Sequence, residues 1–243
     1  MLQRLTQSPP LFLASVTGVE EAQAALASGA DIIDCKAPDQ GALGALPVET
    51  VRAIAARLPP DTLISATIGD LPATAGSLVP AAEAMAATGV GIVKAGFFGG
   101  GDAAQAIRAL GRSDLGGARL YAVLMADRAP DFSLIPVCAD AGFLGVMLDT
   151  AGKTSGALTD VMDHNRLSTF VQRAKAAGLV TGLAGSLSTE HVAQLCALKP
   201  DILGFRGALC ASGRTSALDS NRVRQVRDAL DRATSAVTGR SVA

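Results

Sequence analysis

The chain alternates short apolar runs with helix-forming segments, and it does so eight times along 243 residues. The segments between the runs, such as the alanine-rich stretch 19–29, carry apolar residues at helical spacing. Strands that alternate with helices are joined by crossovers, so they pair in parallel. The apolar runs lie at 11–16, 30–36, 62–70, 91–99, 119–127, 143–150, 179–186 and 201–210.

Eight strand–helix units predict an α/β chain folded as a (β/α)8 TIM barrel, whose usual length is about 250 residues. The nearly continuous apolar runs fit strands that are covered on both faces. A doubly wound open sheet is the alternative, but the first run is followed by SVTGVEEA and lacks a GxGxxG loop. No linker or low-complexity segment divides the chain. We therefore predict a single barrel domain over 1–243, with a frayed tail from about residue 233.

Composition excludes several classes of function. The net charge is −1, no basic block occurs, and the chain has no Trp and one Tyr, so we expect no nucleic-acid partner. The apolar runs are too short to span a bilayer, so we expect no membrane segment. Pro9 and Pro10 break the short apolar run near the N-terminus, so we expect no signal peptide.

Cysteine and histidine usage points to a reduced, metal-free protein. The four cysteines form no CxxC pair, which indicates neither a disulfide framework nor a zinc site. The two histidines, His164 and His191, lie far apart in sequence. We therefore expect a cytoplasmic location, no metal and no cofactor, and we further expect a homo-oligomer.

Charged residues gather where the predicted strands end. In the segment ADIIDCKAP, Asp34 and Lys36 are two residues apart and so share one face of a strand. Unpaired charges are costly to bury, so the two form either a structural ion pair or part of an active-site floor. The carboxyl ends of barrel strands are where active sites lie. The other charged residues at or just after strand ends are Asp70, Lys94, Asp127, Asp149 and Lys153.

The lysines are the most selective part of this pattern. The chain has five lysines against sixteen arginines, yet Lys36, Lys94 and Lys153 all fall at strand ends or in the next loop. Lysine differs from arginine in that its amine can lose a proton and attack a carbonyl. Salt bridges that cap the barrel rim are the alternative for any single lysine. The three together, with Asp34 and Asp149 beside them, favour an active site.

Two later segments have the composition of phosphate-binding loops. GLAGSLST contains Gly185 and Ser186, and GFRGALC contains Arg206 and Gly207. Small residues let backbone N–H groups approach a phosphate, and barrels commonly bind phosphate after strands seven and eight. We predict that these four residues hold a substrate phosphate, in preference to the alternative that the glycines only close the barrel tightly.

The order and content of these segments resemble one enzyme family. GADIIDCKAPDQGALGA, SATIGDLP, IVKAGFFG, MLDTAGK, LAGS and GFRGALC resemble the (5-formylfuran-3-yl)methyl phosphate synthases of methanofuran biosynthesis, over almost the whole barrel. The resemblance implies a carbon–oxygen lyase acting on phosphates, which joins two molecules of glyceraldehyde 3-phosphate and releases phosphate and water. It implies Lys36 as the Schiff-base lysine, Lys94 as the proton acceptor, and Asp34, Asp149 and Lys153 as the remaining polar positions.

The chemistry of these residues agrees with that reaction. An amine that forms an iminium with a triose carbonyl acidifies the adjacent carbon, and neighbouring groups then move the protons. We expect Asp34 to position Lys36 and to assist proton transfer. Two alternatives remain at this point: another Schiff-base class I aldolase acting on a sugar phosphate, and a non-catalytic phosphate-binding barrel.

Overall fold

The computed structural model describes residues 10–98, 100–152 and 156–237 of the chain. Eight parallel strands close into a barrel in chain order, and β8 pairs with β1. Each strand falls inside one of the expected apolar runs, so the predicted (β/α)8 barrel is confirmed. The strands are β1 (Leu11–Val16), β2 (Ile32–Cys35), β3 (Leu63–Thr67), β4 (Ile92–Gly96), β5 (Arg119–Met125), β6 (Gly145–Asp149), β7 (Val180–Leu183) and β8 (Ile202–Phe205).

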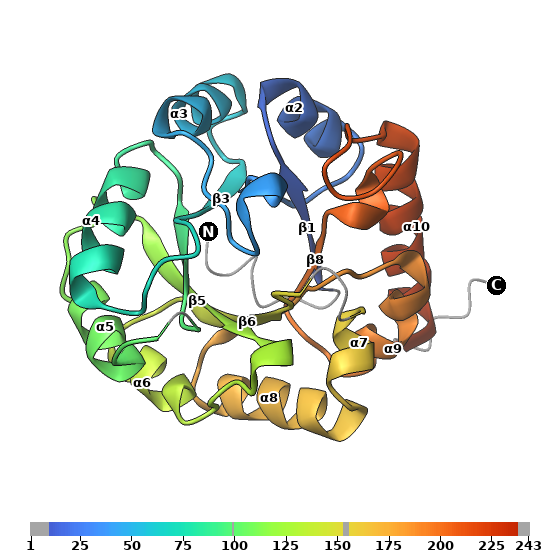
Figure 1. Ribbon diagram of the computed structural model, residues 1–243. Helices are drawn as coiled ribbons and strands as arrows, with labels where there is room; N and C mark the ends of the chain where they lie inside the picture. Colours follow the sequence, from blue (N-terminus) through green and yellow to red (C-terminus); the bar gives the residue numbers. More distant parts are fainter. Residues whose placement is uncertain (1–9, 99, 153–155, 238–243) are drawn as a thin grey trace.

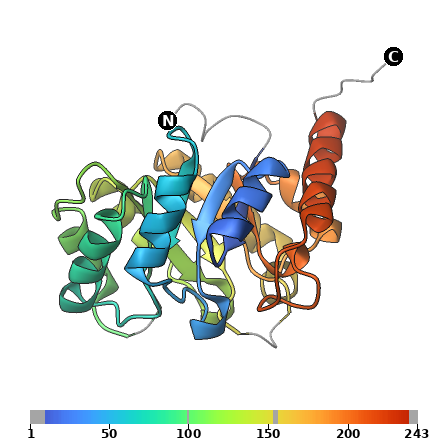
Figure 2. The same cartoon turned by 90° about the horizontal axis from the view of Figure 1, so that it is seen from above.

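The helices form a ring outside the barrel wall (Figure 1). Figure 2 shows the barrel from the side, with the last helix, α10 (red), standing along the wall. The α-helices are α2 (Val19–Ala27), α3 (Val48–Arg57), α4 (Ala75–Ala86), α5 (Ala103–Leu110), α6 (Leu134–Asp140), α7 (Leu158–Val161), α8 (His164–Ala176), α9 (Val192–Cys196) and α10 (Ser220–Val237). Short 3-10 turns are η1 (Pro38–Gln40), η2 (Ala126–Arg128), η3 (Thr189–His191) and η4 (Gly207–Leu209).

The barrel interior changes from apolar to polar along the strands. Alternate residues of each strand point inward, so Ile32 is followed by Asp34, and Ile92 by Lys94. Ile32 and Ile92 belong to an apolar cluster inside the barrel, whereas the outward-facing strand residues pack in the larger core beneath the helices. The polar layer therefore rests on an apolar one and lies nearer the carboxyl ends of the strands.

The C-terminal helix extends further than the sequence indicated. Helix α10 continues to Val237, past residue 233 where we expected the frayed tail to begin, and residues 238–243 lie outside the described residues. In the described ranges, no helix combines the length and the apolar character that a bilayer span requires.

Candidate active site

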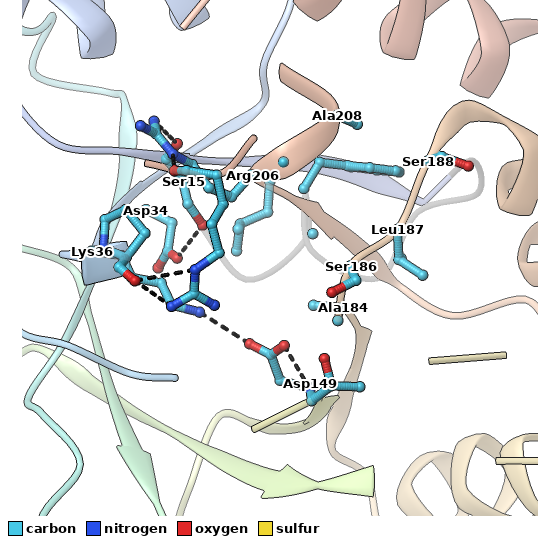
Figure 3. A pocket seen from close by; sticks show the side chains of 18 of the residues that line it. Ser15, Asp34, Lys36, Asp149, Ala184, Ser186, Leu187, Ser188, Arg206 and Ala208 are labelled. Atoms are coloured by element: carbon cyan, nitrogen blue, oxygen red, sulfur yellow. Dashed lines mark hydrogen bonds and ion pairs between the residues drawn. The ribbon is translucent and has the colours of Figure 1, made fainter. Parts of the chain in front are cut away.

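A pocket of about 350 Å³ opens at the carboxyl ends of the strands (Figure 3). Its volume is in the range of small-molecule sites in proteins. The pocket lies where barrel enzymes carry their active sites. Its walls combine strand ends with the loops after β7 and β8, and they include Ser15, Asp34, Lys36, Lys94, Asp149 and Arg206.

Asp34 and Lys94 form a buried ion pair in the floor of this pocket. Lys94 Nζ lies 3.0 Å from Asp34 Oδ1 and 3.1 Å from Oδ2. The hydroxyls of Ser65 and Ser15 also donate to Oδ1 and Oδ2, at 2.6 and 2.9 Å. Asp34 is fully buried and Lys94 is 3% exposed. A buried charge is tolerated only with such partners, and here both carboxylate oxygens have two.

Lys36 and Asp149 form a second pair, closer to the pocket mouth. Lys36 Nζ donates to Asp149 Oδ2 at 3.1 Å, and the other carboxylate oxygen accepts the Thr150 backbone N–H at 2.7 Å. The Lys36 side chain is 12% exposed, which makes its amine easier to reach than that of Lys94. A reachable amine with a carboxylate at hydrogen-bond distance has the arrangement needed to attack a carbonyl and exchange a proton.

The pairing of Asp34 differs from the expectation that it positions Lys36. Within the described residues, Asp34 makes no hydrogen bond or ion pair with Lys36. In the barrel register Asp34 is opposite Ser15 on β1 and Ser65 on β3, whose hydroxyls reach it directly. Lys36 comes after the end of β2, so its long side chain reaches across to β6 instead. Asp34 therefore positions Lys94, and Asp149 positions Lys36.

Cys35, between the two charged residues, faces the opposite side of the strand and is fully buried in the core beneath the helices. Burial, with a further contribution from the charge of Asp34, raises the pKa of the Cys35 thiol far above its ordinary value. The thiol is therefore protonated near neutral pH and is a poor nucleophile. The pocket lining includes two amines that could form an imine with a carbonyl, those of Lys36 and Lys94.

The loop after β7 is held in a conformation suited to anion binding. Gly185 has a φ of 108° and Ser186 a φ of 49°. A Cβ on Gly185 would lie 2.7 Å from the Thr150 Cγ2, so the loop needs glycine to pack this closely against the end of β6. Among the described residues, the backbone N–H groups of Ser186, Gly207 and Ala208 have no protein acceptor, although all three residues line the pocket. Free N–H groups in such loops are typical phosphate donors.

Arg206 has a different role from the one expected. Its guanidinium forms an ion pair with Glu21, with Nη1–Oε2 at 2.6 Å and Nη2–Oε1 at 3.3 Å. The remaining N–H groups donate to the carbonyls of Ser15, Arg214 and Ser216. All five donors of the side chain are thus engaged by the protein. The assignment of Arg206 as a direct phosphate ligand is therefore corrected, and its contacts make it a clamp on the loop after β8.

Some site residues lie outside the described residues or were missed from the sequence. Lys153 falls among residues 153–155, which are not described. Arg214 also lines the pocket, and no sequence pattern points to it, because it lies in a loop well after the end of β8. Ser15 and Ser65 could have been noticed as hydroxyl residues in otherwise apolar strands. In the described part of the chain no three His, Cys, Asp or Glu side chains are grouped to hold a metal ion.

Solved structures with a similar fold are other barrel enzymes. Phosphoribosyl anthranilate isomerase from Thermus thermophilus matches with a TM-score of 0.66 at 18% identity, over 92% of this chain and 98% of that one. KGPDC from Streptococcus mutans matches with a TM-score of 0.65 at 14% identity, over the same shares of the two chains. At such low identity these likenesses establish the fold alone.

Relatives in sequence are much closer. One from Methylorubrum extorquens is 43% identical over 227 residues, which are 93% of this chain and 94% of the relative. The (5-formylfuran-3-yl)methyl phosphate synthase of Methanothermobacter thermautotrophicus is 36% identical, over 91% of this chain and 99% of that enzyme. The enzyme of the same name from Methanocaldococcus jannaschii is 35% identical, over 90% and 98%.

A family model described as 4-HFC-P synthase matches residues 12–227, which include every strand from β2 to β8 and all but one residue of β1. The matched range contains both lysine–carboxylate pairs and both glycine-containing loops. The alternative of a non-catalytic barrel is thereby set aside, and this chain belongs to the (5-formylfuran-3-yl)methyl phosphate synthase family of enzymes.

Proposed function

We propose that this enzyme joins two molecules of glyceraldehyde 3-phosphate into (5-formylfuran-3-yl)methyl phosphate, with release of phosphate and water, in methanofuran biosynthesis. Family membership supports the product, and the resemblance of the site segments supports the triose substrate. One observation carries the proposal. A single pocket contains two lysines, each in an ion pair with its own carboxylate, and loops with free N–H groups lie beside them. Joining two phosphorylated aldehydes through an iminium uses an amine, proton carriers and N–H donors for the phosphates.

Lys36 supplies the amine in this scheme. Its Nζ attacks the carbonyl carbon of one triose phosphate, and the carbonyl oxygen then leaves as water to give an iminium. Asp149, 3.1 Å from the amine, takes the proton that the ammonium loses and returns it to the departing hydroxyl. The positive iminium nitrogen withdraws electrons from the adjacent carbon, so a weak base can remove a proton there.

Lys94 and Asp34 move protons in the later steps. The deprotonated iminium is an enamine, whose carbon attacks the aldehyde of the second triose and forms the new carbon–carbon bond. Ring closure, the loss of water and phosphate, and cleavage of the carbon–nitrogen bond that frees the Lys36 amine and the product then require repeated proton transfers. The Lys94 amine lines the pocket and is held by both oxygens of Asp34, so it can give and accept protons at a fixed position.

The backbone N–H of Ser186, in the loop after β7 that Gly185 shapes, and those of Gly207 and Ala208 after β8 hold one substrate phosphate. Figure 3 shows Ser186 and Lys36 on different sides of the pocket, as expected if a triose spans the distance from amine to phosphate loop. No metal or organic cofactor enters this scheme, because lysines and carboxylates supply each function. The absence of cofactors, a cytoplasmic location and a homo-oligomeric state remain predictions.

Incubation with glyceraldehyde 3-phosphate, followed by mass spectrometry of the product and a phosphate assay, tests the proposal. We expect the furan phosphate together with one equivalent of inorganic phosphate. Reversible carbon–carbon cleavage of a sugar phosphate without phosphate release would instead identify a class I aldolase.

A further inference from the structure

The proposed reaction brings two phosphate groups into one pocket, whereas the loops after β7 and β8 provide donors for one. Four cationic side chains among the described residues line the pocket: Lys36, Lys94, Arg206 and Arg214. The first three are neutralised by Asp149, Asp34 and Glu21. Arg214 has no carboxylate partner in the described part of the chain. A half-buried cation at a pocket wall without a countercharge favours the binding of an anion there.

The Arg214 side chain is held in place by two backbone carbonyls. Its Nε donates to the Pro38 carbonyl at 3.1 Å, and its Nη2 donates to the carbonyls of Pro38 and Gly41. These carbonyls lie in the segment that follows Lys36, so Arg214 is fixed on the Lys36 side of the pocket. The third nitrogen, Nη1, has no acceptor among the described residues. A guanidinium fixed at two nitrogens with its third one free can bind a phosphate oxygen at little entropic cost.

The loop that carries Arg214 is itself tied down. Arg206 donates to the carbonyls of Arg214 and Ser216, at 2.8 and 3.0 Å, and the Leu218 N–H donates to Glu21 at 3.0 Å. The half-buried Glu21–Arg206 pair therefore positions Arg214 through the backbone. This arrangement explains why Arg206 lies next to the pocket without offering it a free donor.

We propose that Arg214 is a second phosphate anchor, which holds the phosphate monoester of the triose that does not form the imine with Lys36. The inference rests on the proposed function. The two anion sites then lie on different sides of the pocket, with the Ser186 loop for one triose and Arg214 for the other. Such a division explains how one pocket orients two copies of the same substrate for different roles.

The test compares two half-saturating concentrations of glyceraldehyde 3-phosphate in each variant, one for borohydride trapping of the Lys36 imine and one for furan formation. Arg214→Met should trap like the parent but need about 10- to 100-fold more triose phosphate for half-maximal furan formation, the loss expected for one charge-assisted hydrogen bond. Arg214→Lys retains a cation and should recover part of this loss. Arg173→Met, an exposed change near the end of α8, should match the parent in both measurements.

Parent-like furan saturation in Arg214→Met would overturn the inference. So would an Arg214→Lys variant as defective as Arg214→Met, or a folded Arg214→Met variant that no longer traps the imine, because both results would assign Arg214 only to holding the segment after Lys36. A parent enzyme that forms no imine and no furan would overturn the proposed function and this inference with it.

Discussion

Asp34 binds the amine of Lys94, which is 60 residues away in sequence, and not that of Lys36, which is two residues away. The two lysines of the pocket therefore belong to separate ion pairs, one fully buried and one near the mouth. This separation gives the two amines different surroundings within one pocket. It is the structural basis for assigning covalent chemistry to Lys36 and proton transfer to Lys94.

The buried pair should show strong energetic coupling. Removing one partner leaves an uncompensated buried charge, which typically costs about 3–5 kcal/mol. We expect Asp34→Asn and Lys94→Met each to lower the free energy of unfolding by about this amount. The double variant should lose clearly less than the sum, with a coupling of about 2 kcal/mol or more in denaturant titrations. Additive losses would mean that the two side chains do not interact.

Lys94→Met should separate imine formation from turnover. The variant keeps Lys36 and Asp149, so borohydride with glyceraldehyde 3-phosphate should still trap the imine. Furan formation should fall by about 10²- to 10⁴-fold, because a positioned proton carrier is lost. Lys199→Met, an exposed lysine just before β8, serves as the matched control. Loss of trapping in a folded Lys94→Met variant would move the covalent role to Lys94.

Asp149→Asn should slow the formation of the imine itself. The amide cannot take the proton from Lys36 or return it to the departing hydroxyl, so trapping should be slower by about 10²-fold. Stopped-time borohydride trapping measures this rate, with the exposed Asp140→Asn as control. An unchanged trapping rate would exclude Asp149 as the proton carrier for this step.

Acid should weaken the clamp on the loop after β8. Although burial alone would raise the pKa of Glu21, hydrogen bonds from Arg206 and Thr17 and the charge of Arg206 lower it below its ordinary 4.5. A lowered folded-state pKa means that the stabilisation is complete above about pH 4.5 and is lost as the pH falls through the lower value.

We therefore expect Glu21→Gln to cost about 2–3 kcal/mol of unfolding free energy at pH 7. The difference in unfolding free energy between the parent and Glu21→Gln should become smaller as the pH drops below about 4.5. Urea titrations at several pH values measure it. A difference that stays constant down to pH 3 would contradict the role assigned to this ion pair.

The sequence predicted the fold well because strand and helix patterns are local. Each apolar run contains one strand, and inward alternation correctly placed both Asp34 and Lys36 on the barrel interior. What the sequence could not predict was the pairing of long side chains. Lys36 reaches an acid 113 residues away, and Arg206 one 185 residues away, so neither partner follows from neighbouring residues.

The same contrast between local and long-range features applies to the residues predicted to bind phosphate. The tight backbone of the loop after β7 could be predicted because it depends on adjacent residues, as the positive φ of Gly185 illustrates, while phosphate binding by the glycine-containing loops stays a prediction. The sequence predicts Arg206 as a phosphate ligand because it lies beside such a loop, whereas in the structure its guanidinium is paired with Glu21. No sequence pattern points to Arg214, because only the closed barrel brings it to the carbonyl of Pro38, 176 residues earlier.

The most direct test of the account is to map the borohydride-reduced adduct formed with glyceraldehyde 3-phosphate. A modified lysine resists trypsin, so an adduct on Lys36 should yield peptide 5–52 in place of 5–36 and 37–52. Lys36→Arg, which keeps the charge but offers no free amine, should remain folded, form no adduct and show no turnover. An adduct found in peptide 58–108, which contains Lys94, or an active Lys36→Arg enzyme would contradict the central claim.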